Sequence, residues 1–265
     1  MDERKEKTLR NMLEQRIFPA DQAFPPRWNR LLLPAIVILA FLIRWICFSL
    51  ESTISTDGTV YVNLAEQWRV TGMYPPHSYL PLYPWLMKLL SGCGMSSFAA
   101  GIGINLFLGS LLPLVCYGLL RLATVRREPA LAAALLAAVH PSLIELSINI
   151  QRDTPYLFFT GCAIFCGLYA VKFGRWYWWS LSSLFLSAGM FSRYEALELL
   201  PIICGYFLFA PIFHSLSWRK ALLNFAVWSI SLVIFIASLI VLMDVREQMT
   251  SAYGERLERV LIRRI

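Results

Sequence analysis

The stretch LLLPAIVILAFLIRWICFSL, residues 31–50, decides the fold class of this chain. Arg44 is its one charged residue, and a helix of about 20 apolar residues crosses the hydrocarbon core of a bilayer. Similar long apolar blocks, none of which alternates like a half-buried strand, lie at 98–120, 129–146, 154–171, 176–191, 196–213 and 221–243. We therefore expect an all-α, polytopic transmembrane protein with about seven spans.

The composition agrees with a bilayer environment. Hydrophobic residues make up 57% of the 265-residue chain and charged residues 15%, whereas soluble domains average about 45–50% and about 25%. The net charge of +7 is typical of Lys and Arg that hold loops on the cytoplasmic side, so we do not expect nucleic acid as a partner. The six cysteines lie mostly inside apolar blocks, which favours packing over disulfides or a metal site.

Basic residues predict the orientation and divide the chain into three parts. The segment 1–30 is rich in Arg and Lys, as are alternate connections further along, which places the N-terminus in the cytoplasm. The module 31–243 follows, with a long outer loop at 51–97. The basic tail 244–265 then falls outside, where an amphipathic helix on the membrane surface would accommodate it. We expect an integral protein of the bacterial inner membrane.

The outer loop contains a second kind of helix. Val60, Leu64 and Trp68 share one helical face, with Tyr61 and Ala65 beside them. This spacing predicts an amphipathic helix that lies along the membrane surface. Prolines end the helix before the next apolar block.

Acidic and basic side chains gather on the predicted outer face. Ionisable residues at membrane depth are costly and tend to be functional, and the outer ends of the spans bring together Asp57, Glu145, Asp153 and Glu195 with Arg152 and Arg193. Each has a structural alternative. Asp57, Arg152 and Asp153 are placed to cap helices, Glu145 to pair with an Arg from a neighbouring helix, and Arg193 and Arg44 to extend toward the interface. His77 is a lone loop histidine, and an interface is expected to carry aromatic residues such as Tyr61 and Trp68 in any case.

Four short motifs carry a family resemblance. They are Ser55-Thr56-Asp57-Gly58-x-x-Tyr61, Pro81-Leu82-Tyr83-Pro84-Trp85-Leu86, His140-Pro141-x(5)-Ser147-x(5)-Asp153 and Ser192-Arg193-Tyr194-Glu195-Ala196-Leu197. In this order, after one span, they resemble the GT-C superfamily of membrane glycosyltransferases over roughly 31–213. The chain looks most like the branch related to dolichyl-phosphate-mannose protein mannosyltransferases and bacterial lipid-linked sugar transferases.

The resemblance implies a specific chemistry. Such enzymes move a hexosyl or pentosyl unit, with inversion, from a polyprenyl-phosphate donor to a glycan, lipid or protein acceptor on the outer face. Asp57 then corresponds to the general base and Asp153 to a second acidic residue of the site. The departing phosphate suits an arginine, so Arg193 and Arg152 are candidates and Arg44 a weaker one. Tyr61, Glu195, His77 and Glu145 complete the expected substrate-binding set.

The sequence does not decide the cofactor or the functional class. The sequence contains no DxD pair and no phosphate-cradling glycine loop, so a soluble nucleotide-sugar site is not supported. No motif supports a divalent metal, although one is compatible with the chemistry. Members of the family usually continue for further spans, so a shortened or split member is also expected. The alternatives are a transporter-like protein or a non-catalytic assembly subunit.

Overall fold

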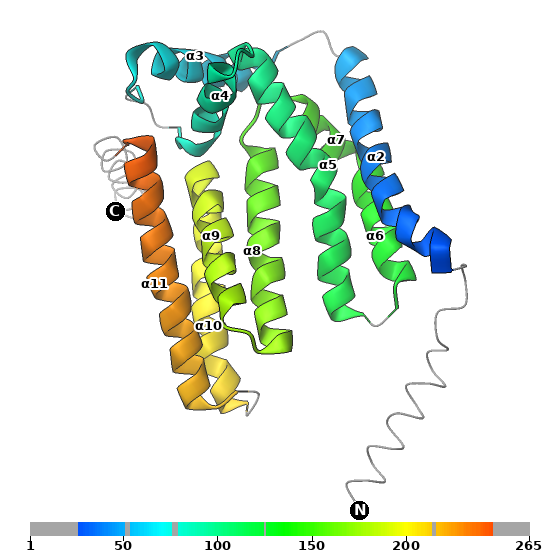
Figure 1. Cartoon of the computed structure of the whole chain (residues 1–265), viewed down its shortest axis with the longest axis vertical. Helices are drawn as coiled ribbons and strands as arrows, with labels where there is room; N and C mark the ends of the chain where they lie inside the picture. The colour runs from blue at the N-terminus through cyan, green and yellow to red at the C-terminus, as the bar shows by residue number, and fades with distance from the viewer. Residues whose placement is uncertain (1–25, 51–53, 76–78, 125, 214–215, 246–265) are drawn as a thin grey trace, which may run out of the picture.

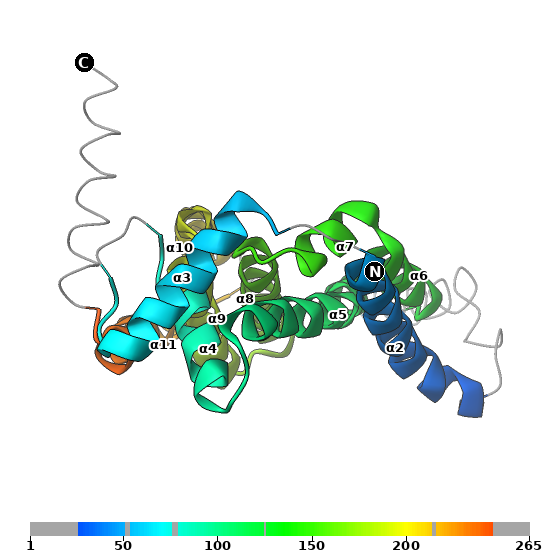
Figure 2. The same cartoon turned by 90° about the horizontal axis from the view of Figure 1, so that it is seen from above.

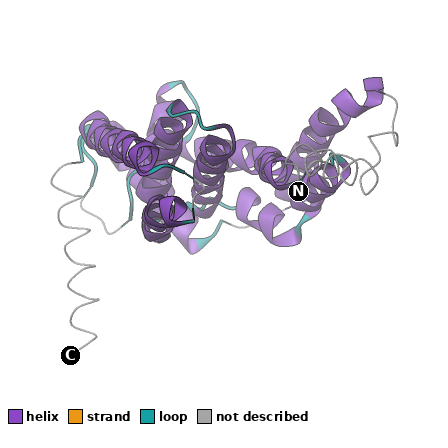
Figure 3. Cartoon of the chain, turned by 90° about the horizontal axis from the view of Figure 1, so that it is seen from below, coloured by secondary structure: helices purple, strands orange, loops and turns teal. Residues whose placement is uncertain are grey.

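The computed structural model describes residues 26–50, 54–75, 79–124, 126–213 and 216–245, with the side chains of 26–30 left aside. Every regular element in these ranges is helical (Figure 3), which confirms the all-α prediction. In chain order the elements are α2 (Pro26–Leu50), α3 (Thr56–Thr71), α4 (Leu82–Gly92), α5 (Ser97–Ala123), α6 (Glu128–Val139), α7 (Pro141–Ile148), α8 (Asp153–Phe173), α9 (Tyr177–Ser192), the 3-10 helix η1 (Tyr194–Glu198), α10 (Leu199–Ile212) and α11 (Trp218–Met243).

The long helices stand side by side as a bundle, and successive ones run in opposite directions (Figure 1). The short helices α3 and α4 lie across one end of this bundle, as the view from above shows (Figure 2). Helix α5 packs against α2, α6 and α8, and α9 packs against α8 and α11. We call the end that carries α3 and α4 the α3–α4 end.

Five helical stretches in the described part of the chain are long and apolar enough to cross a membrane. They are Leu31–Leu50, Ser97–Ala123, Asp153–Phe173, Tyr194–Ile212 and Trp218–Met243. The bent pair α6 and α7 would make a sixth. The expected span at 176–191 forms α9, but its 16 residues extend only about 24 Å, so it falls short of the usual length for a span.

The expected continuous span at 129–146 is broken. Helices α6 and α7 meet at an angle of 50°, and His140 between them is extended, with φ −65° and ψ 121°. The break follows from Pro141, because proline disfavours helical backbone in the residue before it.

Arg44 does not extend toward the interface, contrary to the alternative considered for it. Its side chain is fully buried and donates hydrogen bonds to backbone carbonyl groups at the α6–α7 break. The break exposes carbonyl oxygens that need donors, and the guanidinium group supplies them.

The amphipathic helix in the outer loop is present as α3. Its buried face consists of Gly58, Tyr61, Leu64, Ala65 and Trp68, and it packs against α4 and α5. The apolar face therefore covers the end of the bundle. The helix ends at Gly72, whose φ of 79° is a left-handed conformation that glycine adopts without strain.

The end of α11 also reaches this region. Met243 and Val245 are buried against a cluster that includes Trp68, Tyr74 and Tyr194. The predicted amphipathic tail beyond Val245, the basic N-terminal segment 1–25 and His77 lie outside the described residues.

Candidate functional site

Asp57 is the second residue of α3 and is exposed. It is not the helix cap that the sequence suggested as an alternative. Ser55 occupies the N-cap position, and its Oγ accepts a hydrogen bond of 3.1 Å from the Gly58 amide. With that role filled, the Asp57 carboxylate accepts a hydrogen bond of 3.2 Å from the Tyr79 hydroxyl.

Tyr79 connects Asp57 to a cation. The Arg152 guanidinium carbon lies 5.3 Å from the centre of the Tyr79 ring, a distance typical of a cation–π contact. Partial burial and the neighbouring Asp57 carboxylate raise the pKa of Tyr79 above its ordinary value, so the phenol stays a hydrogen-bond donor. Sequence analysis missed this residue, although it lies between the expected surface helix and the Pro-Leu-Tyr-Pro motif.

Two buried side chains hold the segment between α7 and α8 in place. Asn105 on α5 donates from Nδ2 to the carbonyl groups of Asn149 at 2.6 Å and Gln151 at 2.8 Å. Thr154 donates to the Leu146 carbonyl at 2.8 Å. These bonds set the place where α8 begins, so they position Arg152 and Asp153, which lie at that point of the chain. Asn105 was not among the expected residues, and its only signal was an amide within an apolar block.

Arg193 joins two carboxylates from separate elements. It forms a salt bridge with Asp153 at the start of α8. It also donates to both oxygens of Glu195, at 2.9 Å and 3.1 Å, in the paired geometry that arginine offers a carboxylate. These hydrogen bonds with Glu195 raise the pKa of Arg193 further above its ordinary value. The Tyr156 ring, another residue that the sequence did not single out, lies 5.6 Å from the guanidinium group.

Five of the expected residues therefore belong to one chain of contacts at the α3–α4 end. We call it the polar network. Contacts link Asp57, Tyr79 and Arg152, further contacts link Asp153, Arg193 and Glu195, and the peptide bond between Arg152 and Asp153 joins the two groups. Its members come from α3, the α3–α4 connection, the start of α8 and the α9–η1 junction. Residues nearly 140 positions apart in sequence thus gather at one end of the bundle.

Of the remaining expected residues, Tyr61 borders the network and Glu145 has no ion pair with it. Tyr61 is 1% exposed, packed edge-on against Tyr79 and Tyr83, and its hydroxyl has no partner among the described residues. Burial raises the pKa of Tyr61 above its ordinary value. Glu145 is exposed on α7, and within the described ranges it forms no ion pair.

The two arginines differ in what they can still bind. Arg193 already has two carboxylates, Asp153 and Glu195. Arg152 has a tyrosine ring as neighbour and is in ion-pair contact with no carboxylate of the described chain. Arg152 is close enough to Glu195 for the two charges to interact, but the two form no salt bridge. No three His, Cys, Asp or Glu side chains in the described ranges group as a set that would hold a metal ion.

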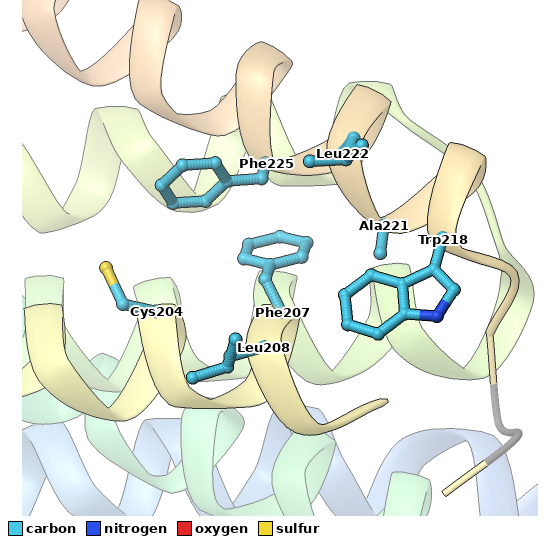
Figure 4. Close-up of a pocket in the computed structure, with 7 residues that line it drawn as sticks. All are labelled: Cys204, Phe207, Leu208, Trp218, Ala221, Leu222 and Phe225. Carbon is cyan, nitrogen blue, oxygen red and sulfur yellow. The ribbon is translucent and has the colours of Figure 1, made fainter. Parts of the chain in front are cut away.

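A pocket of about 260 Å³ lies between α10 and α11, remote from the polar network. Its lining is apolar and aromatic and consists of Cys204, Phe207, Leu208, Trp218, Ala221, Leu222 and Phe225 (Figure 4). Trp218 begins α11, at the end of the bundle opposite α3 and α4 (Figure 1). The lining has no charged side chain, and its polar groups are the Trp218 indole N–H and the Cys204 thiol.

Comparison with protein families identifies a match. The family model for dolichyl-phosphate-mannose-protein mannosyltransferase matches residues 75–241, which is more than half of the chain. The match contains Tyr79, Arg152, Asp153, Arg193 and Glu195, whereas Asp57 precedes it. No curated protein matches the chain.

Proposed function

The chain belongs to the dolichyl-phosphate-mannose-protein mannosyltransferase family, and from this premise we propose that it transfers a sugar from a polyprenyl-phosphate donor to an acceptor hydroxyl at the α3–α4 end. The family and the apolar helices make it a membrane glycosyltransferase of the GT-C type. The acceptor is a hydroxyl of a glycan, a lipid or a protein. We place the α3–α4 end on the extracytoplasmic face, in agreement with the basic N-terminal segment.

The observation that carries the proposal is the polar network. Glycosyl transfer needs a base for the acceptor hydroxyl and a cation for the phosphate that leaves. Asp57 and Arg152 lie on either side of Tyr79, so an exposed carboxylate and an available guanidinium group share one surface. These residues lie at the end of the bundle, and we propose that a lipid-linked donor reaches them from the membrane.

The proposed reaction is a single displacement. The acceptor oxygen attacks the anomeric carbon while the bond between that carbon and the phosphate oxygen breaks. Asp57 takes the proton of the hydroxyl, and polyprenyl phosphate leaves with the bonding electron pair. Attack opposite the leaving group inverts the anomeric centre. Asp153, held by Arg193, lies beside Arg152 in the chain and contributes negative charge where the sugar becomes oxocarbenium-like.

Arg152 and Arg193 have separate proposed roles. Arg152 binds the phosphate of the donor because no described carboxylate occupies it. Arg193 holds Asp153 and Glu195 in place, since its hydrogen bonds are already directed at both of them. Glu195 and Tyr61 then support the site through their neighbours Arg193 and Tyr79 rather than through contact with the phosphate. The roles of Glu145 and His77 in substrate binding stay predictions.

The test is transfer by the purified protein in vesicles. A panel of polyprenyl-phosphate hexoses and pentoses, each with a labelled sugar, is offered with membrane extract as the source of acceptors. We expect label transfer by the wild type and its loss in Asp57→Asn at an unchanged amount of folded protein. Glu128→Gln is the matched control, because Glu128 is likewise an acid in the first turn of a helix but lies at the opposite end.

Two outcomes would contradict the proposal. Full activity in Asp57→Asn would remove Asp57 from the role of base. No transfer by the wild type with any donor of the panel would favour a non-catalytic or transport function instead.

A further inference from the structure

Arg44 is a cation inside the bundle whose contacts are all neutral groups. It is fully buried and donates from Nη1 to the carbonyl groups of Ala40 at 3.1 Å and Ala138 at 3.0 Å. Its Nη2 reaches the Ala137 carbonyl at 3.4 Å, and its Nε reaches Ser147 Oγ at 3.2 Å. A buried charge within a span is costly and tends to have a function, yet the polar network does not include this one.

Two of the carbonyl groups that Arg44 contacts, those of Ala137 and Ala138, are the ones that the helix break deprives of their usual helical donors. In a continuous helix the amide of residue 141 would donate to Ala137, and that of residue 142 to Ala138. Pro141 has no N–H, and the extended His140 turns the next amides away. The C-terminal end of α6 also carries a partial negative charge that favours a cation. Arg44 thus provides both donors and charge for the end of α6.

The same guanidinium group holds α7. Its bond to Ser147 Oγ lies beyond the break, so one side chain of α2 forms hydrogen bonds with both α6 and α7. These three helices adjoin in Figure 1. Gly109 of α5 permits this approach, because a Cβ there would overlap Ser147 Oγ. The angle between α6 and α7 is therefore fixed by a contact with side chains and not by Pro141 alone.

Helix α7 leads directly to the polar network. Ser147 lies in its last turn, and the next residues are the segment that Asn105 holds. Arg152 and Asp153 follow within six residues. A change in the α6–α7 angle would move this segment relative to α3 and Arg193.

We propose that Arg44 is a positioning residue: by fixing the α6–α7 bend it places Arg152 and Asp153 for glycosyl transfer. This inference rests on the proposed function. Arg44 touches neither donor nor acceptor and acts through α7.

The test separates the effect of the α6–α7 angle on kcat/KM from the effect of Arg44 on Tm. Arg44→Met keeps an unbranched side chain but removes every donor, and we expect a lower Tm and a kcat/KM reduced about tenfold to hundredfold, the scale of small misplacements in a site. The double variant Arg44→Met with Pro141→Ala returns an amide to Ala137 and allows a straight helix. It should regain Tm but not kcat/KM.

Recovery of both Tm and kcat/KM in the double variant would overturn the proposal, because Arg44 would then serve only to pair carbonyl groups. If Arg44→Met does not accumulate, Ser147→Ala decides. That variant removes the contact between Arg44 and α7, together with the bond from Ser147 Oγ to the Leu143 carbonyl within the same helix. We expect kcat/KM to fall severalfold with a smaller change in Tm than in Arg44→Met, and an unchanged kcat/KM would refute the role of Arg44.

A second measurement is independent of catalysis. Amide hydrogen exchange of 142–153 should be faster in Ser147→Ala than in the wild type, with exchange in α11 unchanged. Equal exchange in the two proteins would overturn the positioning role. Absence of transfer by the wild type would instead count against the proposed function alone.

Discussion

At the scale of single residues, two arginines differ in their surroundings and therefore in their proposed roles, one in phosphate binding and the other in holding carboxylates. Arg152 and Arg193 both lie in the polar network, but only Arg193 has its donors directed at carboxylates. A sequence pattern does not distinguish them, since both lie in short connections within two residues of an acidic residue. The distinction comes from the three-dimensional contacts of each guanidinium group.

Replacement of each arginine should therefore have a different effect. In Arg152→Gln we expect KM for the donor to rise about tenfold to hundredfold, the value of a hydrogen bond to a charged group, with little change in Tm. In Arg193→Gln we expect loss of roughly 1–3 kcal/mol of stability, because two partly buried carboxylates lose their partner. Donor titration and thermal unfolding in micelles measure the two effects. A raised KM in Arg193→Gln at unchanged Tm would reverse the assignment.

Tyr61 offers a prediction about pH. Its buried hydroxyl lacks a partner in the described chain, so Tyr61→Phe should leave stability unchanged or raise it by up to about 1 kcal/mol. Burial raises the pKa of folded Tyr61 above the unfolded value near 10. Its contribution is then fully present below about pH 10 and is lost as pH rises above that. When the pH is raised from about 8 to about 10.5, the free energy of unfolding should fall less in Tyr61→Phe than in the wild type. A larger fall in the variant would indicate that the hydroxyl has a partner.

At the scale of elements, hydropathy predicted the long helices because each must bury its backbone in lipid. The surface helix was also predicted, although its buried face includes Tyr61 and Ala65 and leaves Val60 half-buried. The break between α6 and α7 was missed because the apolar run continues through Pro141. Whether such a proline ends a helix depends on neighbours that donate hydrogen bonds to the freed carbonyl groups, here Arg44 from α2.

The candidate site was predicted only in part for a similar reason. Charge and position brought Asp57, Asp153, Arg152, Arg193 and Glu195 to one face. Tyr79 and Asn105 were not identified, because their roles depend on how a connection folds back over α3 and on which residue of α5 lies beneath α8. Neither is encoded in local periodicity.

The close approach of α5 and α7 predicts opposite effects for two glycines of one helix. Gly109→Ala would place a methyl group against Ser147, and we expect a loss of about 1–3 kcal/mol, as for other overpacked sites. Gly103→Ala is the control, since its nearest contact would be Met95 at 3.8 Å, and alanine favours helix by roughly 0.5–1 kcal/mol. Thermal unfolding of both variants in micelles compares them. Equal Tm values would indicate that α7 yields to the added methyl group.

At the scale of the whole molecule, the polar network and the apolar pocket occupy opposite ends of the bundle. The network lies with α3 and α4, whereas the pocket begins at Trp218. In the described part of the chain, the proposed site thus lies at one end of the bundle. Its function therefore depends on which face meets the acceptor.

Orientation is testable with a thiol that the chain already has. Cys93 is exposed at the end of α4, and Ser217 is exposed before α11 at the other end. In intact cells, a membrane-impermeant maleimide should label Cys93 but not a cysteine introduced as Ser217→Cys in a Cys93→Ser background. Labelling only at position 217 would place the α3–α4 end in the cytoplasm.

The short length of α9 can be accommodated by its neighbours. Its 16 residues extend only about 24 Å, whereas the hydrocarbon layer is about 30 Å thick. Its buried residues include Ser182, Ser183, Leu186 and Ser187, and α8 and α11 pack against it, so α9 meets protein along much of its surface. A short helix inside a bundle does not require the bilayer to thin, and transfer should therefore depend little on the chain length of the vesicle lipids. A steep rise of transfer in short-chain lipids would instead indicate that α9 faces lipid.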